Sequence, residues 1–259
     1  MHLPYTLPLP PGFSLRDTLT CGQCFRWREN PDGSFTGFAG SRPATLCQQG
    51  DTLFLSDADT AFWGRYLDLD EDYGRWNEAF GADPTLRAAI RFCGGIRILR
   101  QDPWEAVLSF IISANNNIPR IQGIIGRLCD NFGEGGGFPS ARRLAGETPE
   151  SLAPLRAGFR AKYILDAAGK VASGEVGLEQ VAALPLAEAE AELRRICGIG
   201  PKVAQCALLY GFHRLEAFPV DTWMKKVLAR YYPQGFPPLQ PAGVAQQFLF
   251  HYIRSLPED

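Results

Sequence analysis

The spacing of apolar residues changes along the chain and predicts strands first and helices afterwards. Residues 20–56 alternate apolar and polar positions in aromatic-rich runs, with turn signals at residues 31–33 (Pro-Asp-Gly) and 50–51 (Gly-Asp). From about residue 59 onward, apolar residues recur every three to four positions, which is typical of amphipathic helices. The pattern therefore predicts an antiparallel β-rich N-terminal part and a larger helical part.

Helix-starting and helix-ending residues divide the second part into many short helices. An acceptor side chain followed by proline, as in Asp102-Pro103, marks a helix start. The predicted helices span residues 59–67, 72–80, 84–92, 103–114, 118–132, 140–145, 149–154, 158–173, 178–182, 186–196, 202–212, 222–231 and 241–255. We divide this α+β chain into a β-rich domain (1–98) and a helical domain (99–259).

Composition narrows the class of protein. The chain has 259 residues, 46% of them hydrophobic, which is enough for a full core. No run of about 18 uncharged apolar residues predicts a transmembrane helix, and the N-terminal segment lacks the pattern of a signal peptide. The seven scattered cysteines fit a reducing compartment. Cys21 and Cys24 form a C-x-x-C pair, but no second pair with zinc spacing accompanies it. We expect a cytoplasmic protein with no targeting signal and no membrane partner.

The charge of the chain is distributed unevenly. A net charge of −2 does not by itself indicate a nucleic-acid partner. Residues 140–230, however, carry thirteen basic and ten acidic groups, a net of +3. This mild excess permits a phosphate partner without requiring one.

The most informative segment is "GIGPKVAQC" at residues 198–206, between two predicted helices. Gly198 and Gly200 permit a tight turn, and its N–H groups, with that of Val203, would point outward at a helix start. Such a hairpin can bind DNA phosphate, although an ordinary connection between two helices is the alternative. Lys202 opens an apolar helix, where both burial and the helix dipole disfavour an ammonium group. The lysine either reaches solvent or serves as a readily deprotonated amine.

A carboxylate follows nineteen residues later in "FPVDTWMKKVLAR". Asp221 precedes a predicted helix and is expected to be its N-cap. The same backbone hydrogen bonds would hold a carboxylate beside the reactive amine, so both roles are compatible.

These two segments resemble the helix-hairpin-helix plus Gly/Pro-Asp (HhH-GPD) signature of a DNA glycosylase superfamily, in which the lysine marks the bifunctional glycosylase/lyase members. Four further stretches resemble the 8-oxoguanine DNA glycosylase/AP lyase family, in the family's order: "GQCFRW" (22–27), "SANNNIPRI" (113–121), "GFRAKY" (158–163) and "AQQFLF" (245–250). The resemblance implies a TBP-like antiparallel sheet ahead of a helical domain. It also implies a nucleoid-associated monomer that binds duplex DNA containing 8-oxoguanine.

The resemblance assigns chemical roles to the two polar residues at the helix starts. Lys202 would attack C1′ of the damaged nucleotide, expel the base and form a Schiff base that permits β-elimination. Asp221 would stabilise the oxocarbenium-like sugar.

A pocket for the flipped base is implied by the same family. Cys206 and Phe250 would cover its two faces, Gln246 would bond its Watson–Crick edge, and Pro219 would complete the wall. The Gly22 carbonyl would accept the N7–H that 8-oxoguanine has and guanine lacks. Taken alone, Cys206 and Phe250 are equally compatible with ordinary core packing.

Residues for the DNA duplex follow from the same resemblance. Asn115 would fill the gap left by the flipped nucleotide, and Phe159 would wedge into the stack. Arg120 and Arg160 would bond the opposite cytosine. Two positions depart from the familiar pattern: Phe159 stands where a tyrosine is common, and Trp223 where some relatives have a histidine.

No cofactor and no catalytic metal are implied, although the hairpin carbonyls of Ile196 and Ile199 are candidates for a structural monovalent ion. A non-catalytic helix-hairpin-helix module or a monofunctional alkyl-base glycosylase are the alternatives, and the lysine disfavours the second. An iron–sulfur relative lacks support because its four-cysteine cluster is missing from the sequence. The acidic run at residues 68–72 favours a solvated loop over a nuclease metal site.

Overall fold

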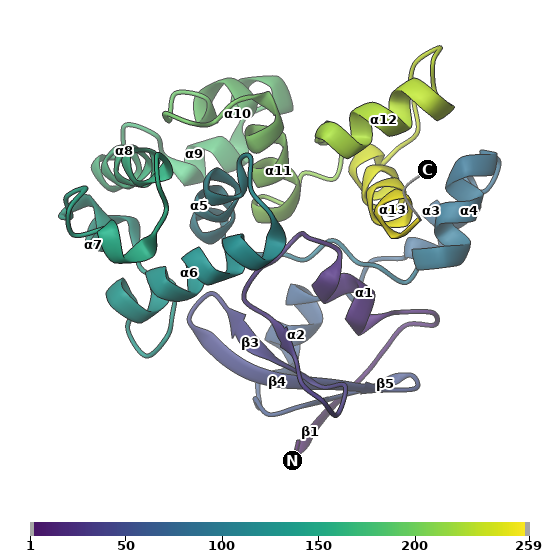
Figure 1. Ribbon diagram of the computed structural model, residues 1–259. Helices are drawn as coiled ribbons and strands as arrows, with labels where there is room; N and C mark the ends of the chain where they lie inside the picture. Colours follow the sequence, from purple (N-terminus) through teal and green to yellow (C-terminus); the bar gives the residue numbers. More distant parts are fainter. Residues whose placement is uncertain (1–2, 257–259) are drawn as a thin grey trace.

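The computed structural model describes residues 3–256 and has the α+β architecture that the sequence predicts (Figure 1). Its five-stranded sheet is antiparallel, with the strand order β1-β5-β4-β3-β2. The strands are β1 (Tyr5–Pro8), β2 (Arg28–Glu29), β3 (Phe35–Ala39), β4 (Arg42–Gln49) and β5 (Thr52–Leu55). Both predicted turns are present, because residues 30–34 join β2 to β3 and residues 50–51 join β4 to β5.

One face of the sheet is apolar because alternate side chains of a strand point to the same side. Phe35, Leu46 and Leu55 are opposite one another on β3, β4 and β5 and are at most 2% exposed. They form a core cluster with Trp63 on α2 (Thr60–Tyr66) and Leu15 on α1 (Leu15–Thr20). The sequence analysis did not predict α1 or β1. Both are short, and α1 begins at the Ser14 cap.

The remaining helices follow the predicted ranges closely. Residues 149–154, predicted to be a helix, instead lead into a 3₁₀ turn, η1 (Ala153–Leu155). The helices are α3 (Tyr73–Phe80), α4 (Pro84–Cys93), α5 (Pro103–Ser113), α6 (Ile118–Phe132), α7 (Ala141–Ala145), α8 (Arg160–Ser173), α9 (Leu178–Ala183), α10 (Leu186–Leu193), α11 (Pro201–Gly211), α12 (Thr222–Tyr231) and α13 (Ala242–Ser255). Within the described range, none is both long and apolar enough to cross a lipid bilayer.

A second core fills the helical part, with α5 at its centre. Nine of the eleven residues of α5 are buried, and the helix packs against α11, α6 and α8. Helices α3 and α4 precede residue 98, yet their buried residues belong to this second core, and α4 packs on α13 (Figure 1). The helical core therefore includes helices from the N-terminal part of the chain and does not begin at residue 99.

Two buried polar side chains anchor the loop between α1 and β2 to the rest of the chain. Arg26 forms an ion pair with Glu105 on α5 at 3.0 Å and donates to the carbonyl oxygens of Gly40 and Gly136. Gln23 is fully buried; its amide donates to the Thr18 and Arg97 carbonyls and accepts from the Leu99 N–H. These bonds fix the loop that holds Gly22.

Candidate active site and DNA interface

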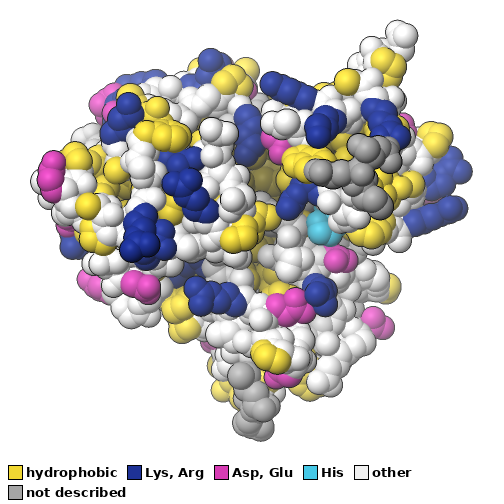
Figure 2. Space-filling model, in the orientation of Figure 1, with side chains coloured by type: hydrophobic (Ala, Val, Ile, Leu, Met, Phe, Trp, Pro, Cys, Tyr) yellow, Lys and Arg dark blue, Asp and Glu magenta, His cyan; other side chains and the backbone are white. Residues whose placement is uncertain are grey.

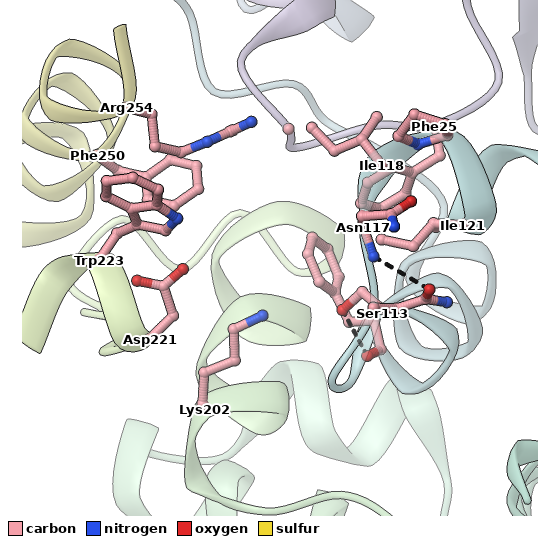
Figure 3. Close-up of a pocket in the computed structure, with 14 residues that line it drawn as sticks. Phe25, Ser113, Asn117, Ile118, Ile121, Lys202, Asp221, Trp223, Phe250 and Arg254 are labelled. Atoms are coloured by element: carbon pink, nitrogen blue, oxygen red, sulfur yellow. Dashed lines mark hydrogen bonds between the residues drawn. The ribbon is translucent and has the colours of Figure 1, made fainter. Parts of the chain in front are cut away.

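Three helices begin around one pocket of about 390 Å³, here called the outer pocket (Figure 3). They are α6, α11 and α12, and the last turn of α13 faces them across the pocket. Residues lining the outer pocket are Gly22, Phe25, Phe110, Ser113, Asn116, Asn117, Ile118, Pro119, Ile121, Lys202, Asp221, Trp223, Phe250 and Arg254. Lys202 and Asp221 both point into it, as the sequence predicts (Figure 3).

The start of α11 has no side-chain cap. Gly200 is its N-cap, and the first backbone bond of the helix runs from the Ala204 N–H to the Gly200 carbonyl at 3.0 Å. A Cβ on Gly200 would meet no atom within 4 Å, so the turn is open on this side. Helix N-termini leave their first N–H groups without intrahelical partners. The hairpin therefore presents backbone donors, including that of Val203, at an open surface, while the Val203 side chain is buried.

Helix α8 holds the hairpin in place. The Asp166 carboxylate accepts the Cys197 N–H at 2.7 Å and pairs with Lys170 at 3.2 Å. Gly198 has φ +87°, and a Cβ there would lie 2.6 Å from the Tyr163 ring, so this position requires glycine. The Ile196 carbonyl accepts the Ile199 N–H within the same turn. The proposed ion at the Ile196 and Ile199 carbonyls stays a prediction.

Asp221 is the N-cap of α12, as predicted. One carboxylate oxygen accepts the Met224 N–H at 2.8 Å, which fixes the side chain at the pocket wall. The chain that leads to it is held by Gln205 on α11, whose amide oxygen accepts the Phe218 N–H at 2.9 Å. The amine and the carboxylate therefore come from adjoining helix starts that share one half-buried support, Gln205.

A narrower cavity, here called the inner pocket, continues from the outer one and has a volume of about 40 Å³. It contains every residue that the sequence assigns to the base pocket or the chemistry; its lining is Gly22, Phe110, Lys202, Cys206, Tyr210, Pro219, Asp221, Gln246 and Phe250. Burial raises the pKa of the Cys206 thiol, and the charge of Lys202 and its hydrogen bond to the sulfur oppose that rise. The thiol is therefore a neutral wall of the pocket.

Two of the residues that line the inner pocket have an acceptor oxygen without a protein partner. Gln246 is 3% exposed, and its amide oxygen forms no hydrogen bond within residues 3–256. Buried polar atoms are almost always bonded, so this oxygen is available to a ligand. The Gly22 carbonyl is likewise unbonded within the described range. Gly22 has φ +93°, a conformation that glycine adopts readily.

The residues predicted to contact the DNA duplex lie around the turn at Asn115. Asn115 has φ +51°, Arg120 is exposed in the first turn of α6, and Phe159 is 52% exposed at the start of α8. Phe159 also packs edge-on against Tyr163, which supports the hairpin glycine. The wedge residue and the hairpin are thus connected through one ring.

Arg160 differs from its predicted environment. It is only 2% exposed, and its guanidinium donates to the Ala114 carbonyl at 2.5 Å and 3.0 Å and to the Asn115 carbonyl at 2.8 Å. Its side chain holds the Asn115 turn in shape. Bonding to an opposite cytosine would therefore require these backbone bonds to be exchanged, whereas Arg120 needs no such change.

Arg254, Phe110 and Tyr210 line the pockets but were not predicted from sequence. Arg254 had a detectable signal, because it continues the four-residue spacing of Gln246 and Phe250 along α13. Phe110 stacks on Tyr210 with ring centroids 5.2 Å apart and lies 5.5 Å from the Lys202 amine. Neither aromatic residue is distinguishable in sequence from ordinary core.

Cys21 and Cys24 belong to different core clusters, and burial raises the pKa of Cys21 to about 12. Both thiols are buried in the core, where they donate to the backbone carbonyls of Thr18 and Leu19. Among the residues that the structure describes, no group of three or more His, Cys, Asp or Glu side chains is arranged to hold a metal ion.

Comparison with known proteins identifies the family to which this site belongs. The chain matches the 8-oxoguanine DNA glycosylase N-terminal domain over residues 6–107 and the HhH-GPD superfamily of base excision DNA repair proteins over residues 108–235. The N-glycosylase/DNA lyase OGG1 of Arabidopsis thaliana is 31% identical over 89% of this chain and 67% of its own length. The N-glycosylase/DNA lyase of Saccharomyces cerevisiae is 36% identical over 53% of this chain, which spans only 42% of that relative.

Solved structures extend the similarity over nearly the whole chain. MBOgg1 in complex with a low-affinity DNA ligand superposes with a TM-score of 0.91 at 41% identity, covering 96% of this chain and 94% of the other. The 8-oxoguanine glycosylase/lyase of Clostridium acetobutylicum, bound to duplex DNA with cytosine opposite 8-oxoguanine, gives 0.87 at 36% identity, with 94% and 92% covered. The chain belongs to the 8-oxoguanine DNA glycosylase family of the HhH-GPD superfamily.

Proposed function

We propose that this protein removes 8-oxoguanine from duplex DNA and then cuts the strand at the resulting site. One observation carries the proposal: Lys202 and Asp221 line the same pocket. The inner part of this pocket is also lined by Gly22 and Gln246, whose carbonyl and amide oxygens accept no hydrogen bond within the described residues. An amine, a carboxylate and a base-reading pocket are the parts that a bifunctional glycosylase needs. The names of the relatives support the same activity.

In the proposed complex, the flipped base enters the inner pocket between Cys206 and Phe250. Because the free cavity of about 40 Å³ is smaller than a purine base, the half-buried Phe250 ring moves outward to admit it. The Gly22 carbonyl accepts the N7–H of 8-oxoguanine. Guanine would instead present a lone pair to that carbonyl, and a site built to bond one N–H rejects the analogue that lacks it. The Gln246 amide bonds the Watson–Crick edge.

The chemistry begins when the Lys202 side chain, having released a proton to solvent, attacks C1′ through its amine and the C1′–N9 bond breaks, with the electron pair of that bond leaving on the base. Asp221, held by the Met224 N–H, stabilises the positive charge that develops on the sugar. The sugar ring then opens to a Schiff base on Lys202. Loss of a C2′ proton drives departure of the 3′ phosphate, which is the β-elimination step.

The duplex would lie across the hairpin, the Asn115 turn and Phe159. We propose that Gly198, Gly200 and Val203 offer backbone N–H groups to a phosphate, that Asn115 replaces the flipped nucleotide, and that Phe159 wedges beside it. Arg120 donates hydrogen bonds to the opposite cytosine. Arg160 can do the same only if its guanidinium gives up its hydrogen bonds to the Ala114 and Asn115 carbonyls. We further propose that the protein acts as a monomer in the cytoplasm.

Borohydride trapping tests the proposal directly, because only an amine that forms a Schiff base yields a covalent protein–DNA adduct. We expect an adduct with a duplex containing 8-oxoguanine and none with the same duplex containing guanine. Strand cleavage without an adduct would contradict the role of Lys202. Base release without cleavage would instead indicate a monofunctional glycosylase, and tight binding without either reaction a non-catalytic module.

A further inference from the structure

Arg254 is a charged side chain in the outer pocket that neither the predicted base contacts nor the proposed chemistry uses. It lies on the last turn of α13, one turn beyond Phe250, and its guanidinium carbon is 5.0 Å from the centre of the Phe250 ring. The Nη1 atom reaches the other wall, 3.3 Å from where a Cβ on Gly22 would lie. Figure 3 shows the side chain extending over Phe250 toward the open pocket.

The Arg254 guanidinium has no acceptor in the described part of the chain. Residues 3–256 provide neither a hydrogen bond nor an ion pair to it, although a guanidinium has five N–H donors. The arginines at positions 26, 100 and 160, by contrast, all bond carboxylates or carbonyls. The stack on Phe250 keeps Arg254 oriented while leaving its donors available.

The position of Arg254 decides which part of a nucleotide it can meet. Phe250 and Gly22 line both pockets, whereas Arg254 lines only the outer one. A base seated in the inner pocket carries its sugar toward Lys202 and Asp221 at the junction of the two pockets. The phosphates must then lie in the outer pocket, on the side of Arg254.

The surroundings of the guanidinium favour an anion. Trp223, an indole N–H donor, lines the same wall, and Lys202 is the other cation of the outer pocket. Asp221 is the only carboxylate among the lining residues, and its cap bond directs it to the start of α12. A guanidinium matches phosphate geometry with two parallel N–H bonds, which a planar fork provides better than an ammonium.

We propose that Arg254 binds a DNA phosphate next to the flipped nucleotide and so holds the sugar over Lys202. The inference deepens the proposed function and depends on it for the placement of the nucleotide. It adds a second phosphate site on α13, formed by a side chain, to the hairpin site on α11, formed by backbone.

Methylphosphonate substitution tests this contact because it removes the charge of one phosphate at a time. The probe is a duplex containing a tetrahydrofuran abasic analogue, which has no base and cannot be cleaved through a Schiff base. Each phosphate within two positions of the analogue is replaced in turn, and affinity is measured at fixed salt. The proteins are wild type, Arg254→Ala and Arg254→Gln, with Arg65→Ala on α2 as a control for the same loss of charge at an exposed remote site.

We expect one methylphosphonate position to weaken wild-type binding about tenfold, in the range of a lost charge-assisted hydrogen bond. At that position alone, the methylphosphonate should not weaken DNA binding by the Arg254 variants. It should weaken binding by Arg65→Ala as much as binding by the wild-type protein. The slope of log affinity against log salt should fall by about 0.9 for the Arg254 variants, the value for one phosphate. Arg254→Gln keeps most of the stem, so it serves if Arg254→Ala is unstable.

Two outcomes would overturn the proposal. Equal sensitivity of wild type and Arg254 variants at every phosphate would show that Arg254 contacts none of them. Normal binding of the abasic duplex by the variants, combined with weak binding of the 8-oxoguanine duplex, would assign the guanidinium to the base. Borohydride trapping on the lesion duplex distinguishes these failures from failure of the proposed function, because Schiff-base formation requires Lys202 and not Arg254.

Discussion

The helices α11 and α12 both begin at the active-site pocket, but they satisfy their first N–H groups in opposite ways. Helix α12 has the Asp221 side chain as a cap, bonded to the Met224 N–H at 2.8 Å. Helix α11 has Gly200 at the same position and no side-chain bond. A good cap contributes about 1 kcal/mol to stability, so α11 forgoes a stabilising contact that its neighbour keeps.

The difference is explained by what each helix start must offer. An uncapped start leaves backbone donors free for an external anion, while a capped start fixes a carboxylate in one orientation. Helix α11 tolerates the missing cap because Pro201 presets its first turn and eight of its eleven residues are buried. Helix α12 has only two buried residues and depends more on its cap.

The largest effect should come from removing the side chain that each helix start presents. Lys202→Gln should abolish the borohydride adduct, and Asp221→Asn should slow base excision about 10²–10³-fold, because the cap survives but its charge is lost. Single-turnover rates and trapping on an 8-oxoguanine:cytosine duplex measure both. Lys225→Gln, an exposed lysine on α12 outside both pockets, is the matched control. A trapped adduct with Lys202→Gln would refute the assignment to α11.

The sequence predicted the starts of α11 and α12 better than it predicted the surroundings of Arg160, for a physical reason. An Asp before an amphipathic run is a local signal, and so are the glycines of the hairpin. Arg160 is a non-local case: its partners are carbonyls 45 and 46 residues away in sequence, and only the fold reveals that it is buried. The strands and most helices have periodic patterns. Strand β1 is almost wholly exposed and has no alternation of buried and exposed positions, and α1 is a helix of six residues that begins at the Ser14 cap.

A third helix start, that of α6, extends the comparison to the opposite strand. Its Asn117 cap accepts the Arg120 N–H at 3.0 Å and leaves the Arg120 side chain exposed. If that guanidinium bonds cytosine, wild type should process 8-oxoguanine:cytosine faster than 8-oxoguanine:adenine. Arg120→Ala should reduce this preference about tenfold to a hundredfold, the value of one bidentate contact.

Single-turnover rates with each of the four opposite bases measure this preference. Arg142→Ala, which removes an exposed arginine of α7, should leave the ratio unchanged. A wild-type profile that is flat across the four bases would exclude cytosine reading and leave the Lys202 chemistry intact.

A smaller effect is expected when α11 receives the kind of cap that α12 has. Gly200→Asp places a carboxylate at an extended backbone position with no atom near its Cβ, so the side chain fits without strain. It should occupy the free N–H groups, raise stability by a few tenths of a kcal/mol, and repel phosphate. Binding to damaged and undamaged duplexes should weaken alike, by about tenfold or more, the equivalent of about 1.4 kcal/mol.

Gel-shift affinities at fixed salt and a thermal unfolding curve measure the two consequences together. Gly200→Ala is the control, because it adds a side chain without charge or an acceptor. Unchanged affinity of Gly200→Asp for both duplexes would mean that the hairpin does not contact DNA.

The smallest effect separates the structural role of Asp221 from its chemical one. Asparagine retains an oxygen that can accept the Met224 N–H, so Asp221→Asn should change the free energy of unfolding little. Asp221→Ala loses the cap and should cost about 1 kcal/mol, which lowers Tm by roughly 2–4 °C in a chain of this size. Both variants should be equally defective in base excision.

The Asp102 cap of α5 is the matched control, because its side chain accepts the Glu105 N–H at 2.9 Å and lines neither pocket. Asp102→Asn and Asp102→Ala should therefore differ in Tm by a similar amount without loss of excision. Equal Tm values for the two Asp221 variants would show that the carboxylate is retained for its charge alone, and the contrast between α11 and α12 would then lie in chemistry and not in capping.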